Sequence, residues 1–366
     1  MKKRVLYIDD EINGGRPQIE AIKDALEANG LLEVILCEVS DLDTITNQIK
    51  LDKAQGVILD LQLDQFVNSQ NIKINFKAPT LAQNIREKST EDSSLDIPII
   101  LCSTQQKIES LYKRDISSHD LFDMRFHKDL PNYDLEAARI HSIINGYKLI
   151  SETNFEIDRI LKIELTNIDY RIYSNLLVTD HLPSHNIAQV ILKDLMYING
   201  PLINEELLAA RLGVDIFNSP SWTELKNTFM GDAKYKGAFS DGWNRWWMHE
   251  VLSIFQDLTG KNLATLDAKE RVRLTKVSTG LTELSYPEKI EKCNSFKYWT
   301  VCKGLNKPLD PREGFKIIMT REPKAWQEYD YISFEAALER LGFEEKCIKL
   351  HPSEKERFEL MKETLQ

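Results

Sequence analysis

Short β-branched runs alternate with amphipathic stretches from residue 4 to about residue 150. In the amphipathic stretches, apolar residues recur three and four positions apart, which is the spacing of one helix face. The alternation occurs five times and predicts an α/β domain in which helices cover a parallel sheet. The strands are expected at Arg4 to Ile8, Leu32 to Val39, Gly56 to Leu59, Ile97 to Cys102 and Met124 to His127. The helices are expected at Gln18 to Ala28, Leu42 to Ile49, Thr80 to Glu87, Gln105 to Arg114 and Leu135 to Lys148.

One connection in this half is unusually long. The segment from about Asp64 to Lys77 is polar and delays the third helix to roughly Thr80. Connections between a strand and a helix usually have about two to six residues. We therefore interpret this segment as a functional or decorative loop.

Charged and hydroxyl side chains stand at the ends of four of the predicted strands. They are Asp9 and Asp10 after the first, Asp60 after the third, Ser103 and Thr104 after the fourth, and Lys128 after the fifth. In an open parallel sheet, ligands bind outside the carboxyl ends of the strands, near the point where the strand order reverses. We therefore expect these side chains to meet in one site.

The chemistry of this set favours a divalent cation and phosphoryl transfer. Mg²⁺ prefers oxygen ligands and is usually held by one or two carboxylates, several waters and a substrate phosphate. Asp9, Asp10 and Asp60 can supply those carboxylates. A carboxylate can also act as a nucleophile and form an aspartyl phosphate when metal and cation neutralise the phosphoryl charge. Ser103 and Lys128 stand at strand ends from which they could assist.

Four segments, RVLYIDDE, GVILDLQ, IPIILCST and MRFHKDL, resemble in order and spacing the motifs of response-regulator receiver domains. The resemblance covers residues 1 to about 148 and implies a flavodoxin-like, doubly wound sheet of five parallel strands. It implies that Asp60 accepts the phosphoryl group, that Ser103 hydrogen-bonds this group and that Lys128 pairs with it. The Mg²⁺ ligands that it implies are Asp9, Asp10, Asp60 and the backbone carbonyl of Gln62.

Three residues depart from the usual receiver pattern. Arg125 stands where a switch aromatic is usual, although Phe126 is adjacent, and Asp129 stands where a proline is typical. Thr104 replaces a smaller residue, and we expect its bulk to slow the access of water to an aspartyl phosphate. All three departures bear on the output of the domain rather than on its ability to accept phosphate.

Other interpretations of these residues fit less well. Haloacid-dehalogenase-like phosphatases also place an aspartate after a buried strand, but they need a second aspartate two residues later, where Gln62 stands. Gly14 and Gly15 lack the spacing and the Lys-Ser/Thr pair of a nucleotide-binding loop. Taken singly, the aspartates could be strand-end caps and Lys128 a solvated charge. A receiver fold that has lost its chemistry is a further alternative.

From residue 149 to residue 366, longer helical stretches and many aromatics predict a mainly helical α+β domain with a sub-boundary near residue 285. Helices are expected at Ile187 to Met196, Ile203 to Gly213, Trp222 to Met230, Tyr331 to Leu341 and Ser353 to Leu365. Strands and turns are expected from Cys293 to Thr320. The helices on either side of Gly213 resemble a helix-turn-helix or a winged-helix-like element. However, the second of them, SWTELKNTF, offers few side chains that read base edges.

Three tryptophans lie close together in the segment YKGAFSDGWNRWWMHE. On a helix, Trp243 would share a face with Trp246 or Trp247. Such clusters usually belong to a core, whereas an exposed one would form a hot spot for a partner protein. We favour the core.

Composition narrows the class of protein. The chain has 366 residues, 42% of them hydrophobic and 28% charged, as in soluble globular proteins. No apolar run reaches the length of a membrane span, we read no signal peptide, and the five cysteines fit a reducing cytoplasm. Cys293 and Cys302 match no zinc pattern. The net charge of −10 argues against broad binding to nucleic acid.

The sequence therefore predicts a receiver domain at residues 1–148 and an output or interaction domain at residues 149–366. A histidine kinase would donate the phosphoryl group to Asp60, and the second domain would signal by binding a protein. One alternative is a phosphate-sink receiver in an anti-phage two-component system. Another is a DNA-binding transcriptional response regulator. The phosphorelay function requires no enzyme active site beyond self-phosphorylation and autodephosphorylation of Asp60, and an enzyme in residues 149–366 is a further alternative.

Overall fold

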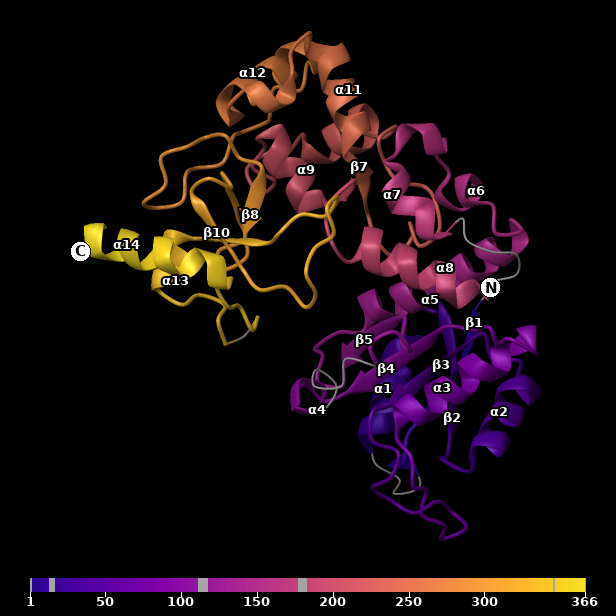
Figure 1. Cartoon of the computed structure of the whole chain (residues 1–366). Helices are drawn as coiled ribbons and strands as arrows, with labels where there is room; N and C mark the ends of the chain where they lie inside the picture. The colour runs from indigo at the N-terminus through magenta and orange to yellow at the C-terminus, as the bar shows by residue number, and fades with distance from the viewer. Residues whose placement is uncertain (1, 13–16, 111–117, 177–182, 345, 366) are drawn as a thin grey trace. The chain divides into compact units, whose positions relative to one another are not determined.

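The computed structural model describes residues 2–12, 17–110, 118–176, 183–344 and 346–365 (Figure 1). All neighbouring strands of its first sheet are parallel, in the order β2-β1-β3-β4-β5. The five strands are β1 (Lys3–Ile8), β2 (Leu32–Cys37), β3 (Gly56–Asp60), β4 (Ile99–Ser103) and β5 (Met124–His127). This order confirms the prediction of a doubly wound parallel sheet.

Five helices follow these strands within a few residues of their predicted bounds. They are α1 (Pro17–Glu27), α2 (Leu42–Leu51), α3 (Ala78–Ser89), α4 (Gln105–Ser110) and α5 (Asp134–Glu152). Helix α1 contacts α5, and α2 contacts α3, as expected for a sheet with a helical layer on each face. The predicted last turn of the fourth helix, residues 111–114, lies outside the described residues.

The core of this sheet explains why its strands are almost continuously apolar. Every residue of β3 and of β4 is buried, including the polar residues Asp60 and Ser103 at their ends. Strands that are covered on both faces need apolar side chains on both faces, in contrast to the alternation of a half-exposed sheet. Side chains of α2 and α3, among them Ile45, Leu81 and Ile85, complete one side of the core.

The chain divides into two compact units, each made of two segments. Unit 1 contains residues 1–193 and 236–243, and unit 2 contains residues 194–235 and 244–366. Besides the sheet and its helices, unit 1 has α6 (Ile157–Leu161), α7 (Tyr170–Tyr173) and α8 (Ser184–Ile191), and α8 contacts α5. The predicted functional boundary at residue 148 falls inside α5 and stays a prediction.

Residues 236–243 of unit 1, which we call the α5 strap, lie against α5. The side chain of Phe239 is so close to Gly146 of α5 that a Cβ atom on this glycine would be 2.1 Å from Cε1 of the ring. Asp241 accepts hydrogen bonds from the Ser142 hydroxyl and, at 3.2 Å, from Nδ2 of Asn145. The backbone N–H of Ala238 donates to the carbonyl of Ile160 at 2.8 Å.

Asp123, which precedes β5 and is 1% exposed, is the centre of a buried polar network in unit 1. Its Oδ2 atom accepts from the Arg86 guanidinium and from the backbone N–H of Ile99, both at 2.8 Å. Its Oδ1 atom accepts from the Tyr147 hydroxyl at 2.8 Å and from Nε2 of Gln189 at 3.0 Å. This one carboxylate therefore connects α3, β4, α5 and α8.

Unit 2 contains mixed helices and two small sheets, ordered β10-β11-β8-β9 and β6-β7. Its helices are α9 (Glu205–Leu212), α10 (Trp222–Glu224), α11 (Met248–Thr259), α12 (Ala268–Thr279), α13 (Phe334–Leu338) and α14 (Lys355–Leu365). Its strands are β6 (Leu202–Ile203), β7 (Trp246–Trp247), β8 (Thr300–Cys302), β9 (Lys307–Leu309), β10 (Gly314–Lys316) and β11 (Tyr331–Ser333). The strands and turns that were predicted for residues 293–320 are present as β8 to β10.

Most helices predicted for the second half of the chain are found, with altered ends. Helix α8 continues into a π-helical turn over Leu192–Met196, and α10 continues into another over Leu225–Phe229. Helix α9 begins only at Glu205, because the Asn204 side chain caps it by accepting from the backbone N–H of Leu207 at 2.9 Å. It ends as predicted at Gly213, which has a φ of +76°.

The helix predicted from Tyr331 to Leu341 is partly wrong. Residues Tyr331–Ser333 form β11, which pairs with β10 and β8, and the helix α13 covers only Phe334–Leu338. Ser333 starts that helix, since its side chain accepts a hydrogen bond from the backbone N–H of Ala336. Strand pairing across the sheet thus overrides the local helical pattern.

The tryptophan cluster is buried, as predicted, but not on a helix. Trp243, Trp246 and Trp247 are 7%, 1% and 4% exposed. Trp246 and Trp247 form β7, which pairs with β6, so the expected shared helix face is wrong. The helix begins directly afterwards, at Met248.

Among the described residues, no helix combines the length and the apolar character that crossing a bilayer requires.

Candidate functional site

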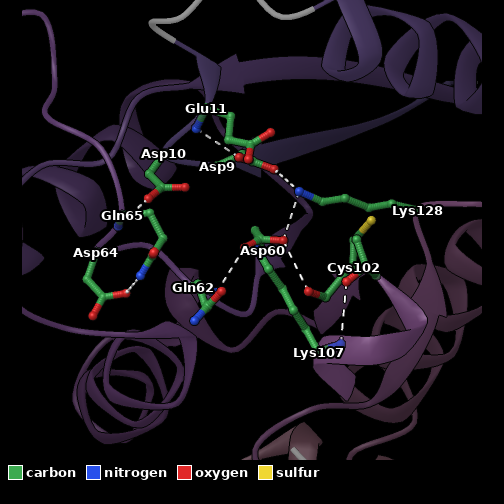
Figure 2. Close-up of polar contacts among 12 residues, drawn as sticks. Asp9, Asp10, Glu11, Asp60, Gln62, Asp64, Gln65, Cys102, Lys107 and Lys128 are labelled. Atoms are coloured by element: carbon green, nitrogen blue, oxygen red, sulfur yellow. Dashed lines mark hydrogen bonds and ion pairs between the residues drawn. The ribbon is translucent and has the colours of Figure 1, made fainter. Parts of the chain in front are cut away.

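The polar residues that end the strands of the first sheet converge at one edge, as predicted (Figure 2). Asp60 is the last residue of β3 and Ser103 is the last residue of β4, while Asp9 and Lys128 directly follow β1 and β5. The strands run parallel and in register, with Ile8 beside Leu59 and Asp60 beside Cys102. Their ends therefore bring side chains from four strands within hydrogen-bonding reach of one another.

Lys128 lies between two carboxylates at the centre of this site. Its Nζ atom donates to Oδ1 of Asp60 at 2.8 Å and to Oδ2 of Asp9 at 2.6 Å, and all three side chains are almost fully buried. Burial alone would lower the pKa of Lys128, but the charges of Asp60 and Asp9 outweigh it and hold this pKa well above its usual value. The lysine therefore remains a fixed positive charge beside Asp60.

Both oxygens of Asp60 have hydrogen-bond donors. Oδ1 also accepts from the Ser103 hydroxyl at 3.3 Å, and Oδ2 accepts from the backbone N–H of Gln62 at 2.8 Å. Burial raises the pKa of Asp60, although the charge of Lys128 acts in the opposite direction. These donors fix the orientation of the carboxylate at the end of β3.

Asp10 has different partners from Asp9 and Asp60. Its Oδ2 atom accepts from the backbone N–H groups of Gln65 at 2.6 Å and of Phe66 at 3.0 Å. Both donors belong to the long connection between β3 and α3. Burial raises the pKa of Asp10, and the two backbone hydrogen bonds act against this. The long loop thus reaches into the site.

The residues of the site fit a Mg²⁺ ion by the chemistry of their donor atoms. Three buried carboxylates face one buried ammonium, so the site carries excess negative charge that a hard cation would offset. Among the described residues, no three acidic, histidine or cysteine side chains are grouped so that they could hold a metal ion together. Mg²⁺ does not need such a group, since it usually keeps several waters and binds only one or two carboxylates.

The sequence did not reveal several residues that contact this site. Nζ of Lys107, on α4, is 4.0 Å from Oδ2 of Asp60 and gives this carboxylate a second nearby ammonium. The Tyr7 hydroxyl donates to Oδ2 of Asp9 at 3.2 Å, and the Tyr133 hydroxyl donates to the backbone carbonyl of Lys128 at 2.5 Å. The sequence does place Lys107 one helical turn after the end of β4, and this position could have indicated that its side chain reaches the site.

Of the three departures from the receiver pattern, Asp129 directly follows Lys128 and is exposed. Arg125 is exposed on β5, whereas the adjacent Phe126 is buried with its ring at 5.9 Å and 84° to that of Tyr133. The Thr104 hydroxyl accepts from the backbone N–H of Lys107 at 3.4 Å. The position where the switch aromatic was expected therefore faces outward, and an inward aromatic occupies the next position.

No family model matches the chain, and no curated protein matches it. Several solved structures of receiver domains match its N-terminal part. One is the response regulator protein TrrA from Thermotoga maritima in complex with Mg²⁺-BeF, with 21% identity over 38% of this chain and 98% of that chain, and a TM-score of 0.27. Another is the BeF3-activated N-terminal receiver domain of RstA from Klebsiella pneumoniae, with 16% identity, coverages of 39% and 98%, and a TM-score of 0.27.

A third match is a sensor protein from Polaromonas sp. JS666, with 16% identity, coverages of 40% and 98%, and a TM-score of 0.29. Each of these three matches covers 38% to 40% of this chain, and the rest of the chain is unassigned. The strand order and the register described above define the fold of this part of the chain.

Proposed function

We propose that this chain is a receiver protein of a two-component phosphorelay, in which a histidine kinase donates a phosphoryl group to Asp60. The observation that carries the proposal is the position of Lys128, 2.8 Å from Asp60 and 2.6 Å from Asp9 at the carboxyl edge of the sheet. A nucleophilic carboxylate beside a fixed cation and further carboxylates is the arrangement that aspartyl phosphate formation requires.

The proposed reaction moves one phosphoryl group between two side chains. An oxygen of Asp60 attacks the phosphorus of the donor's phosphohistidine, and the P–O bond forms as the P–N bond breaks. The imidazole leaves with the electron pair of that bond and takes up a proton. Lys128 and the Ser103 hydroxyl are within 3.3 Å of Oδ1 of Asp60, where each can stabilise an oxygen of the transferred group.

Asp9, Asp10 and Asp60 are the candidate carboxylates, of which one or two would hold Mg²⁺, and the backbone carbonyl of Gln62 is a further candidate ligand. When bound, the ion would offset the negative charge of the carboxylates and of the incoming phosphoryl group. Lys128 contributes to the same balance from within the protein. Its burial makes this contribution larger than that of an exposed lysine, because a buried charge is screened less by water and salt.

We propose that the rest of the chain provides the output by binding a protein. DNA binding receives little support from the second helix of the helix-turn-helix-like segment. Its exposed residues are Thr223, Glu224, Asn227 and Thr228, and Lys226 is paired with Glu205 at 2.6 Å. A DNA-reading helix needs free cations around the side chains that contact bases.

Incubation with acetyl phosphate and Mg²⁺ tests the proposal. We expect an acid-stable, alkali-labile phosphoryl adduct on the parent protein and on Asp64→Asn, a neighbouring aspartate that does not touch Lys128. We expect none on Asp60→Asn, which lacks the nucleophile. Intact-protein mass spectrometry measures the added phosphoryl group directly. Equal labelling of the parent and Asp60→Asn, or no labelling of either, would disprove the proposal.

A further inference from the structure

The long connection between β3 and α3, residues 61–77, is held to the sheet at its two ends. Leu61, Leu63 and Ile74 are buried, and the backbone N–H of Ala78 donates to the carbonyl of Leu61 at 3.2 Å. Between these anchors the chain turns back on itself, with Val67 paired antiparallel to Lys73. We call this segment the β3–α3 loop. It has a defined conformation and is therefore able to hold another group in place.

The contact of this loop with Asp10 leaves one carboxylate oxygen for other partners. The N–H groups of Gln65 and Phe66 both donate to Oδ2, at 2.6 Å and 3.0 Å. Figure 2 shows this oxygen turned to the loop and the other carboxylate oxygen turned into the site. A carboxylate that receives two hydrogen bonds on one oxygen has its rotation fixed, and so the direction of its second oxygen is fixed too.

A depression on this side of the site lies between acidic side chains and residues of the β3–α3 loop. It is lined by Asp9, Asp10 and Glu38, and by Phe66, Val67 and Ile74. The backbone N–H of Ser69 also donates to Glu38, at 3.3 Å. The β3–α3 loop therefore contacts two of the three carboxylates that line this depression, Asp10 and Glu38, in both cases through backbone N–H groups.

We propose that the β3–α3 loop is a positioning element for the cation of the proposed function, and that it acts through Asp10. Ligating carboxylates generally need hydrogen bonds from a surrounding shell to keep their orientation, and loss of such a bond weakens metal binding about 10- to 100-fold. Here the shell consists of two backbone N–H groups, so the side chains at positions 65 and 66 can vary while the contact persists.

Two substitutions at one position separate the backbone contact from the side chain. Gln65→Pro removes the N–H that donates to Asp10, whereas Gln65→Ala keeps it. Titration of each full-length variant with MgCl₂ in a calorimeter, at constant ionic strength, gives the affinity for the ion. We expect Gln65→Pro to bind Mg²⁺ about tenfold more weakly than Gln65→Ala, the effect of losing one hydrogen bond to a charged group. The affinity of Gln65→Ala should match that of the parent.

The dependence of labelling on Mg²⁺ distinguishes positioning from structural damage. If the loop only positions Asp10, Gln65→Pro needs more Mg²⁺ but reaches the parent's rate of labelling by acetyl phosphate at saturation. A reduced rate that excess Mg²⁺ does not restore would overturn the proposal. So would an equal or higher affinity of Gln65→Pro for Mg²⁺.

A measurement on the unmodified chain applies even if Gln65→Pro does not fold. The contact of the loop with Asp10 and the binding of Mg²⁺ affect each other equally. If this contact raises the affinity for Mg²⁺, bound Mg²⁺ must therefore stabilise the contact to the same degree. We expect the amide hydrogens of Gln65 and Phe66 to exchange about tenfold more slowly in saturating Mg²⁺ than in EDTA. If calorimetry detects bound Mg²⁺ but the exchange of these amides is unchanged or faster, the positioning role is contradicted and the proposed metal site is not. If calorimetry detects no bound Mg²⁺, both the positioning role and the proposed metal site are contradicted.

Discussion

The ring of Phe239 lies directly against the Cα atom of Gly146, with no room between them for a methyl group. An alanine in the middle of a helix is ordinarily more stable than a glycine. At position 146 of α5 we expect the opposite. Gly146→Ala should lower the free energy of unfolding of unit 1 by about 1 to 3 kcal/mol, as overpacking usually does. Urea denaturation followed by circular dichroism measures the difference.

A double variant checks that Phe239 is the cause. Phe239→Ala removes the ring, so Gly146→Ala should cost less in that background than in the parent. The difference between the two costs is the coupling energy of the pair. Equal costs in both backgrounds would show that the glycine is required for another reason.

Asp123 provides a second test of stability. Asp123→Asn leaves the guanidinium of Arg86, which is 5% exposed, without its charged partner. Removing one member of a buried ion pair typically costs about 3 to 5 kcal/mol, because the other charge stays buried. Glu33→Gln is the matched control, since Glu33 pairs with Arg4 at 3.2 Å but both side chains are about half exposed. It should cost less than about 1 kcal/mol. Similar losses in the two variants would contradict the burial argument.

Asp96 makes stability depend on pH. Burial would raise the pKa of Asp96, but the His185 ring, with Nδ1 3.5 Å from Oδ1, and the backbone N–H of Ser184, which donates to Oδ2 at 2.6 Å, outweigh it and hold this pKa below its ordinary value. A carboxyl group with a lowered pKa in the folded state stabilises the fold above its ordinary pKa and loses that contribution as the pH falls through the folded pKa. The parent should therefore be more stable than Asp96→Asn at about pH 6, and the difference should shrink toward about pH 3. A difference that is independent of pH would contradict this.

Lys107 should assist the phosphoryl group at Asp60. Its ammonium is 4.0 Å from Oδ2 of Asp60, but the side chain is 30% exposed, so its contribution is partly screened by water. We expect Lys107→Gln to slow labelling by acetyl phosphate by an amount on the order of 1 kcal/mol in barrier, with little change in Lys107→Arg. Initial labelling rates at saturating Mg²⁺ measure this. An equal loss in both variants would point to the packing of α4 instead of charge.

Thr104 should lengthen the lifetime of the aspartyl phosphate. Thr104 directly follows Ser103, whose hydroxyl donates to Asp60 at 3.3 Å, and its own hydroxyl accepts from the backbone N–H of Lys107 at 3.4 Å. Thr104→Ala should admit water more readily and shorten the half-life of the label, without changing the labelling of Asp60 at early times. The decay of the adduct after removal of acetyl phosphate gives the half-life, and identical decay in both proteins would rule out this role.

The sequence predicted which side chains of unit 1 lie together at the edge of the sheet, because the determinants of that arrangement are local. Asp60, Ser103 and Lys128 each follow a short apolar run, and the carboxyl ends of parallel strands necessarily share one edge of the sheet. The same reasoning could not find the network of Asp123. Its partners Arg86 and Gln189 are 37 and 66 residues away, and only the packing of α3 and α8 brings them together.

Errors arose where a distant partner decides the local structure. Residues 331–333 were predicted to begin a helix, but β8 and β10 pair with them and keep them extended. Trp246 and Trp247 have helical spacing relative to Trp243, yet pairing with β6 makes them a strand. Local periodicity contains no information on whether a neighbouring strand is available.

The α5 strap means that neither compact unit is a continuous stretch of chain. The polypeptide leaves unit 1 after residue 193, returns for residues 236–243, and then leaves again. A fragment that ends at residue 193 would therefore lack the α5 strap, which covers Gly146 and accepts the hydrogen bond of the Ser142 hydroxyl. The side chains of α5 under the strap would then be exposed. For the same reason, a single proteolytic cut between the two units cannot release either one, because the remaining crossings of the chain would still tie them together.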